Sequence, residues 1–182
     1  MKKKVLSVLL LALVAVSFLA ASDNSISLTG TPYGMQFVST TINTKHRSNY
    51  GFGFKAGYTH SFGVFQVGAD VSYRNYKYNK EHITAHLGNL QVLAKVGAGF
   101  ELSEKMRMSV NAGVGGEFDV SRLSSNINFV LGADLNVSYK LSDKFSIVGG
   151  LDFTRSTAAS KNSNYKASII NLNPTLGAQM NF

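Results

Sequence analysis

The residues that decide the fold lie between positions 90 and 118 and read LQVLAKVGAGFELSEKMRMSVNAGVGGEF. From Leu90 to Phe100 every second residue is apolar, and polar residues or glycines, such as Lys95, occupy most of the positions between them. Leu93 breaks this alternation. Successive side chains of a β-strand point to opposite faces, so a period of two predicts a strand with one apolar and one polar face. The pattern resumes after a short polar connector, which predicts a second strand of the same kind.

The same alternation recurs along most of the chain. With a first strand around Tyr33, Met35 and Phe37, it predicts eight strands, and the other seven apolar series span residues 52–58, 65–73, 90–100, 106–118, 129–139, 145–153 and 170–182. Three connectors are tight, at residues 60–64, 103–105 and 142–144. Four are longer and polar, at residues 42–50, 75–88, 119–126 and 155–165. Short and long connectors in alternation are typical of an antiparallel up-and-down transmembrane β-barrel, with turns on one side and loops on the other.

Two prolines fall in the first and last strands, which would meet where the barrel closes. Pro32 begins the first strand and Pro174 lies inside the last, although proline cannot donate a hydrogen bond to a strand ladder. Before Pro32, Ile26 and Leu28 are apolar on the opposite parity from Tyr33. We therefore expect a bulge near Gly30.

Residues 1–22 have the three parts of a secretory signal peptide. Lys2–Lys4 form a basic region, Val5–Leu19 an apolar region, and Ala20-Ala21-Ser22 a small-residue cleavage site. The alternative is a retained membrane anchor, but an apolar stretch of about 15 residues is short for a span that needs about 20. We expect cleavage after residue 22 and one outer-membrane barrel domain at residues 23–182.

The composition narrows the class of protein further. Charged residues make up 15% of the 182 residues, against about 25% in a typical soluble domain. Beyond the signal segment, 15 basic and 10 acidic residues leave a modest formal charge of +5. The absence of cysteine excludes disulfides, thiolate nucleophiles and cysteine-ligated metals.

The polar face carries most of the glycines and nearly balanced charges, which indicates that it faces the lumen. An eight-stranded interior has room for side chains and little else, and charges crowded there must be paired. The predicted lumen charge network consists of Lys55, Asp70, Arg74, Lys95, Glu101, Arg107, Glu117, Asp119, Asp134, Lys140 and Asp152. A soluble lipocalin-like carrier, the alternative, would place the apolar face inside.

The apolar face has almost no charge and ends in aromatic residues, as a lipid-facing surface does. The aromatic residues expected near the turns are Phe62, Phe65, Phe100, Tyr139, Phe145 and Phe182. Those expected toward the loops are Phe52, Tyr73, Phe118, Phe129 and Phe153. We interpret residues 73–78, which interleave aromatic and basic side chains, as part of this interfacial girdle rather than as a nucleic-acid site.

These features, together with a last strand ending LGAQMNF at residues 176–182, resemble the small Gram-negative outer-membrane barrels. The nearest group comprises OmpX, the OmpA membrane domain and the opacity proteins. The resemblance covers the whole mature chain and implies an outer-membrane location. It also implies that the outer-membrane assembly machinery reads a signal at Leu176, Ala178, Met180 and Phe182.

Three motifs could carry chemistry, but each has a simpler explanation. His82 and His86 have a metal-binding spacing on a helix, but here they fall where a loop enters a strand, so i and i+4 lie about 13 Å apart. His60 and Ser61 are neighbours on a strand and therefore point to opposite faces. The glycine-rich run at residues 113–116 lies in a strand, with no helix to bind an anion. We expect no catalytic, cofactor or metal site.

The loops are basic, which suggests contact with anionic groups outside the cell. Glu81 is outnumbered by Lys45, His46, Arg47, Lys77, Lys80, Arg122, Arg155, Lys161 and Lys166. Plain solubility of the loop tips is the alternative. We expect outer-membrane lipids, lipopolysaccharide-type headgroups and the assembly machinery as partners, an extracellular ligand through the loops, no nucleic acid, and a monomer.

The predicted function is that of a non-enzymatic outer-membrane barrel with a filled polar lumen and a structural or surface-interaction role. A narrow porin or small-molecule conduit is the alternative, although balanced charges in an eight-stranded lumen argue against an open channel. A lipid A-modifying enzyme is less favoured, because the residues offer no catalytic constellation.

Overall fold

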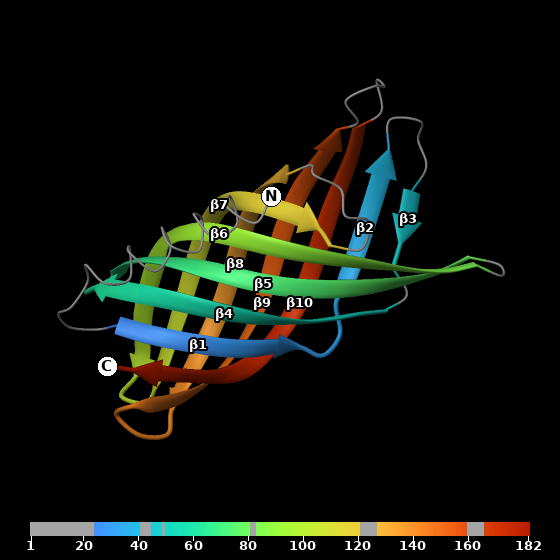
Figure 1. Cartoon of the computed structure of the whole chain (residues 1–182). Coiled ribbons are helices and arrows are strands. Elements are labelled where there is room, and N and C mark those ends of the chain that lie inside the picture. The colour runs from blue at the N-terminus through green and yellow to red at the C-terminus, as the bar shows by residue number, and fades with distance from the viewer. Residues whose placement is uncertain (1–23, 41–44, 49, 81–82, 121–126, 160–165) are drawn as a thin grey trace.

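The computed structural model describes residues 24–40, 45–48, 50–80, 83–120, 127–159 and 166–182, and its regular elements there are β-strands (Figure 1). The strands are β1 (Asn24–Thr31), β2 (Met35–Thr40), β3 (Lys45–Arg47), β4 (Tyr50–Phe62), β5 (Phe65–Lys80), β6 (Ile83–Ser103), β7 (Met106–Asp119), β8 (Ile127–Lys140), β9 (Phe145–Ala159) and β10 (Lys166–Asn181). Among these residues no helix could cross a membrane. The expected signal peptide and its cleavage site lie outside the described residues.

The strands form one antiparallel sheet that closes on itself through the pairing of β1 with β10. β1 pairs with β4 and β10, whereas β2 pairs with β3 and β10. β2 therefore continues the line of β1, and β3 continues the line of β4, so that ten segments make eight wall strands. The predicted eight-stranded up-and-down barrel is confirmed.

The tight turns lie at one end of the barrel. Figure 1 places the turns that follow β4, β6 and β8 at the same end as the start of β1 and the end of β10. Gly63 sits in the first of these turns with a φ of 64°, a conformation that glycine adopts without steric cost. We call this end the turn side and the opposite end the loop side.

The seam contains the bulge that the change of parity predicts. The register of the first strand against β10 shifts by one residue between the pairs Gly30–Leu176 and Met35–Leu172. The extra residue lies in the non-strand segment 32–34, slightly beyond the expected position near Gly30. Pro174 of β10 pairs with β9 opposite this interruption, where the seam ladder has no registered partner for it.

The long connectors expected at residues 42–50, 75–88 and 155–165 are partly wrong. β3 lies within the first, β5 and β6 extend to Lys80 and Ile83 in the second, and β9 runs to Ala159 in the third. The apolar alternation stops earlier because a strand beyond the membrane has no lipid-facing side. Its backbone ladder continues nonetheless, and sequence periodicity does not detect it.

The predicted assignment of faces agrees with the burial of the side chains. Lys95 and Asp70 are buried inside, whereas Val96 and Phe65 are 62% and 72% exposed on the outside. Leu93, the exception to the alternation, is buried inside the lumen with 7% exposure. Val130 and Val148 are also buried among the inward positions of β8 and β9.

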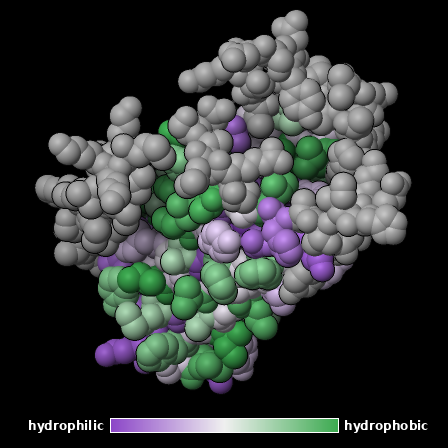
Figure 2. Space-filling view, turned by 45° about the vertical axis from the view of Figure 1, so that its right-hand side comes forward, coloured by the Kyte–Doolittle hydropathy of each residue, from purple (hydrophilic) through white to green (hydrophobic). Residues whose placement is uncertain are grey.

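The outer face is an apolar surface, and Figure 2 shows its hydrophobic side chains gathered on the barrel wall. Phe54, Val114, Leu135 and Leu176 are each more than 40% exposed, although they belong to four different strands. A soluble monomer rarely exposes a continuous apolar patch of more than a few hundred Å². This surface fits a hydrocarbon environment.

The girdle interpretation of residues 73–78 is wrong for two of its tyrosines. Tyr76 is 1% exposed and lies inside the barrel, where its hydroxyl donates to Asn173 Oδ1 at 3.0 Å. Tyr78 also faces inward, and its hydroxyl donates to Gln36. The parity of β5 assigns them this face, since they follow Asp70 and Arg74 at even positions.

Candidate functional site in the barrel lumen

A pair of basic side chains crosses the lumen to one carboxylate at the middle of the barrel. Lys55 Nζ of β4 lies 2.7 Å from Asp152 Oδ1 of β9, and Arg74 Nη2 of β5 lies 3.2 Å from Asp152 Oδ2. These strands face each other across the interior rather than pairing side by side. The three side chains are at most 7% exposed. The contact therefore ties opposite walls together.

Lys95 forms a second buried cluster beside the first. Its ammonium lies 2.7 Å from Asp70 Oδ2 and 3.1 Å from Asp134 Oδ2. Asn111 Nδ2 donates to the other oxygen of Asp134 at 2.7 Å. The gap between the two clusters measures only about 10 Å³, which is room for about one water. The middle of the lumen is thus filled.

Neutral side chains extend this network to the loop side. Arg74 Nη1 donates to Gln91 Oε1 at 2.6 Å, and Gln91 donates in turn to Glu117. Ser156 Oγ donates to the other Glu117 oxygen at 3.0 Å. Glu117 is 1% exposed, and no base among the described residues forms an ion pair with it. Neutral donors and the chain from Arg74 hold this carboxylate.

A second hydrogen-bonded chain closes the lumen beside the seam. Asn171 Nδ2 donates to Thr154 Oγ1 at 3.0 Å, and Gln36 Nε2 donates to Asn171 Oδ1 at 2.8 Å. Tyr78 completes the chain by donating to Gln36. All but Tyr78 are at most 2% exposed. We call the residues of both chains, together with Tyr76 and Asn173, the loop-side plug.

Tyr76 fits into the plug because the two backbone positions beside its ring, Gly34 and Gly51, are glycines. A Cβ added to Gly51 would meet the ring of Tyr76 at 2.7 Å from Cε1, and one added to Gly34 would meet the same atom at 3.3 Å. Glycine at these two positions lets the backbone approach the ring closely. The plug therefore depends on backbone contact as well as on hydrogen bonds.

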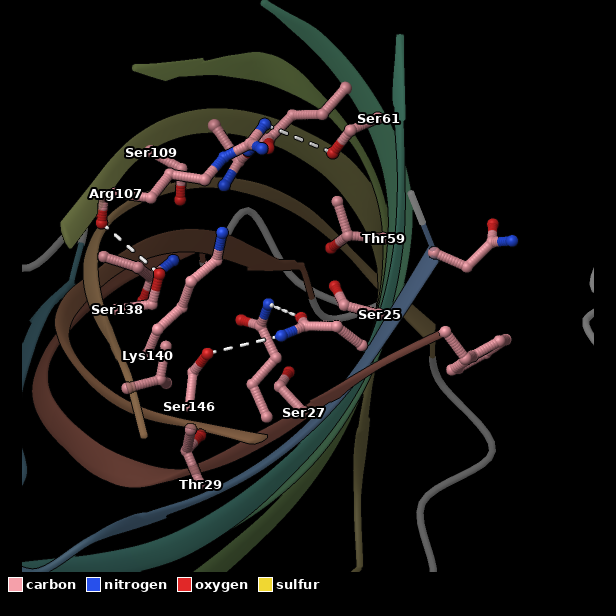
Figure 3. A pocket seen from close by; sticks show the side chains of 18 of the residues that line it. Ser25, Ser27, Thr29, Thr59, Ser61, Arg107, Ser109, Ser138, Lys140 and Ser146 are labelled. Carbon is pink, nitrogen blue, oxygen red and sulfur yellow. Dashed lines mark hydrogen bonds between the residues drawn. The ribbon is translucent and has the colours of Figure 1, made fainter. Parts of the chain in front are cut away.

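A cavity of about 500 Å³ occupies the turn side of the lumen (Figure 3). Hydroxyl and amide side chains line most of its wall, and these are Ser25, Ser27, Thr29, Thr59, Ser61, Gln66, Ser109, Asn111, Asn136, Ser138, Ser146, Gln179 and Asn181. Lys55 and Lys95 mark its inner end. The lumen thus has a filled loop side and a hollow turn side.

The remaining predicted lumen charges lie near the ends of the barrel. Arg107 Nη1 lies 3.3 Å from Glu101 Oε1 at the mouth of the cavity, and Arg107 Nη2 donates to Ser61 Oγ at 3.3 Å. Lys140 also lines the cavity and is exposed. Asp119 is half-buried at the loop-side end of β7. Of the eleven predicted residues, the structure joins Lys55, Asp70, Arg74, Lys95, Asp134, Asp152 and Glu117 in the middle and loop-side layers.

Sequence reasoning missed the neutral members of the network. Within the loop-side plug, Gln91 and Thr154 accept hydrogen bonds from Arg74, and Gln36 donates to Asn171. Tyr76 is buried beside them. Their inward parity is readable from the alternation, since Gln36 lies between the apolar Met35 and Phe37 and the others share the parity of predicted lumen charges. Their role is not, because it depends on long side chains meeting across strands that are distant in the sequence.

The structure describes the side chains of two histidines, His60 and His86. His60 Nδ1 is 2.7 Å from Asn24 Oδ1, and its ring packs edge-on against Phe62, whereas Ser61 faces the cavity. The pair therefore points to opposite faces, as predicted. His86 is exposed, and His82 lies outside the described residues. No metal-binding group of acidic and histidine residues occurs in the described part of the chain.

The residues of the expected assembly signal lie on the outer face of β10. Leu176, Met180 and Phe182 are 61%, 43% and 59% exposed, and Ala178 is exposed between them. This stretch pairs with β1 at the seam.

No protein-family model and no curated protein sequence matches this chain. Among solved structures it is similar to Neisserial surface protein A, with a TM-score of 0.55 and 13% identity over 87% of this chain and 97% of that chain. Ail, the attachment invasion locus protein of Yersinia pestis, matches with a TM-score of 0.42 and 14% identity over 88% and 100%. The outer-membrane protease OmpT from Escherichia coli matches with 0.44 and 8% over 90% and 98%.

The likeness to Neisserial surface protein A shows the fold. The chain is an outer-membrane-type β-barrel, and its apolar outer face is the surface that such barrels turn to lipid. Identities this low do not carry an activity from one barrel to another. The residues that bear on the function of this chain are those of its own lumen and the basic side chains at its loop side.

Proposed function

We propose that this chain is a non-enzymatic outer-membrane barrel with a closed lumen, which acts through its basic loop-side rim. One observation carries the proposal: the hydrogen bonds and ion pairs of the loop-side plug cross the interior and join opposite walls of the barrel. Arg74 alone reaches Gln91, Thr154 and Asp152, which belong to β6 and β9. A route for a solute would require these contacts to break together.

The loop-side rim supports an interaction with anionic groups of the outer leaflet. Lys77 and Arg155 follow Tyr73 and Phe153 on the outward-facing parity of β5 and β9, just beyond the apolar belt. Long basic side chains at that level reach the headgroup region. Lipid phosphates attract them with about 1 kcal/mol per charge. The sequence places further basic residues in the neighbouring loops.

The proposal includes the processing and assembly of the chain. Residues 1–22 are removed as a signal peptide, and residues 23–182 form the barrel. The outward stretch of Leu176, Ala178, Met180 and Phe182 acts as the assembly signal, and the barrel is a monomer. The alternating exposure of β10 supports the assembly signal, since every second residue from Leu176 to Phe182 lies on the outer face.

The test reconstitutes the folded protein in planar bilayers and in vesicles. We expect little or no steady conductance, and stronger binding to lipopolysaccharide than to a neutral lipid surface. Lys77→Gln combined with Arg155→Gln should weaken that binding without changing the conductance. Binding that these substitutions leave unchanged would contradict the role of the rim.

The turn-side cavity favours a second candidate, a narrow conduit that opens transiently, because it already hollows one half of the lumen. Large and stable open channels in the same bilayers would establish the conduit and refute the closed lumen. Hydrolysis of radiolabelled lipid A by the purified barrel would instead establish an enzyme.

A further inference from the structure

The turn-side cavity has the size and chemistry of a binding site for a small polar molecule. Its volume is about 500 Å³. Known ligand-binding sites have volumes of about 300–1,000 Å³. Those sites are mostly apolar, whereas this wall is built of hydroxyl and amide groups, and Val148 is one of its few apolar residues. An apolar ligand would leave these groups without hydrogen bonds, which is costly.

The mouth of the cavity carries an excess of positive charge. Its ionisable side chains are Glu101, Lys105, Arg107, Lys140, Asp143 and Lys144. Four are basic and two acidic, so the side chains at the mouth have a formal excess of two. The lysines at the inner end do not change this count, because Lys55 and Lys95 already contact buried carboxylates.

Lys140 is the strongest single indication of an anionic ligand. It occupies an inward-facing position of β8, and Figure 3 shows its side chain extending into the cavity between Ser138 and Ser146. Among the described residues no carboxylate lies within ion-pair distance of its ammonium. Lys140 is thus a cation that extends into a polar cavity open at the turn side.

Neutral groups around Lys140 can bind the uncharged part of such a ligand. Gln179 donates to Asn181 at 2.7 Å, and Asn181 donates to Ser146 at 3.3 Å, which forms a row of amides and hydroxyls along the wall. On the same wall Thr29 is buried, and its Oγ1 has no hydrogen-bond partner among the described residues. A ligand with several hydroxyl groups would pair with such a surface.

We propose that this cavity binds a small phosphorylated sugar or polyol that enters from the turn side. The phosphate dianion contacts Lys140 and the excess positive charge at the mouth. The hydroxyl groups of the ligand point inward to the serine and amide wall. This site is separate from the loop-side rim, so its failure and the failure of the proposed rim function are distinguishable.

The experiment titrates the folded barrel in an uncharged detergent with glucose 6-phosphate and follows backbone amide shifts by NMR. We expect saturable shifts at cavity residues of β1, β8 and β9, with a dissociation constant of about 1 mM or tighter. Glucose has the hydroxyl groups without the charge. Its affinity should be at least about tenfold lower than that of glucose 6-phosphate. The absence of cavity shifts up to about 20 mM ligand would overturn the proposal.

Lys140→Gln tests the residue that gives the site its preference for an anionic ligand. This variant should weaken binding of glucose 6-phosphate roughly fivefold to twentyfold, and it should fold because Lys140 is exposed and holds no ion pair in the described structure. Lys144→Gln, in the adjacent exposed turn, should weaken binding less. Lys77→Gln removes the same charge at the opposite end of the barrel and should leave the cavity affinity within about twofold. Equal affinity of wild type and Lys140→Gln, or equal binding of glucose and its phosphate, would refute the assignment.

Discussion

Replacing Lys95 with Gln should destabilise the barrel strongly, because one ammonium serves two buried acids. Lys95 Nζ lies 2.7 Å from Asp70 and 3.1 Å from Asp134, whose side chains are 6% and 7% exposed. No other base among the described residues is within ion-pair distance of either. Removing one partner of a buried pair costs about 3–5 kcal/mol, since the remaining charge is left uncompensated.

The two acids should not contribute equally to this loss. Asp134 keeps hydrogen bonds from Asn111 and Asn136, so it retains donors after the substitution. Asp70 loses its ion pair and has no comparable donor in the described contacts. Adding Asp70→Asn to Lys95→Gln therefore removes the worse-placed charge. We expect the double variant to be at least about 1 kcal/mol more stable than Lys95→Gln alone.

The assay is equilibrium unfolding by denaturant in lipid vesicles, followed by far-ultraviolet circular dichroism in both directions. Lys77→Gln is the matched control, because it removes the same charge at the loop-side rim. In vesicles of neutral lipid, which have no anionic surface to attract Lys77, it should change the free energy of unfolding by no more than about 0.5 kcal/mol. A loss of less than about 1 kcal/mol for Lys95→Gln would refute the account of the buried cluster. A double variant that is less stable than the single one would refute the ranking of the acids.

Three further predictions test the wall, the plug and the last strand. Ala94→Lys should lower the free energy of unfolding by about 2–4 kcal/mol in the same assay, because it places a charge in hydrocarbon. Ala94→Leu should leave the free energy of unfolding unchanged. A strongly destabilising Ala94→Leu would mean that the two faces of the strand are inverted. Gly51→Val should displace the Tyr76 ring, with a loss of about 1–3 kcal/mol and a rise in bilayer conductance; unchanged stability would contradict the packing of the plug. Deleting Phe182 should lower the outer-membrane yield more than the in vitro stability, and equal yields would argue against an assembly signal.

The barrel was predictable from the sequence because a strand in contact with lipid needs an apolar residue at every second position. A strand between lipid and a polar lumen must alternate, so Ala94 and Lys95 are assigned to opposite faces without knowledge of their neighbours. The bulge at the seam was predictable for the same reason, since Ile26 and Leu28 keep the outward face only if one residue is inserted before β2. Beyond the membrane this constraint ends, and the extensions of β5, β6 and β9 were missed.

The contacts inside the lumen depend on strand stagger, which alternation does not determine. A shift of β9 by two residues against its neighbours would keep every side chain on its predicted face. It would nevertheless carry Asp152 away from Lys55 and Arg74. Tyr76 illustrates the same limit in another way, because its place in the plug depends on glycines of the neighbouring strand and on the segment 32–34.

The division of the lumen into a filled and a hollow half follows from side-chain size. The number and tilt of the strands fix the width of a barrel, so the inward side chains at each level decide how much of that width is occupied. On the loop side these are large, as in Arg74, Tyr76 and Gln91, whereas on the turn side they are small, as in Ser27 and Ser138. Small residues cannot span the interior, and longer side chains at the mouth, such as Lys105 and Lys140, are exposed. The cavity is therefore determined by the small inward-facing residues of the strands. A ligand with negative charge and hydroxyl groups would fill this volume and balance the excess positive charge at the mouth.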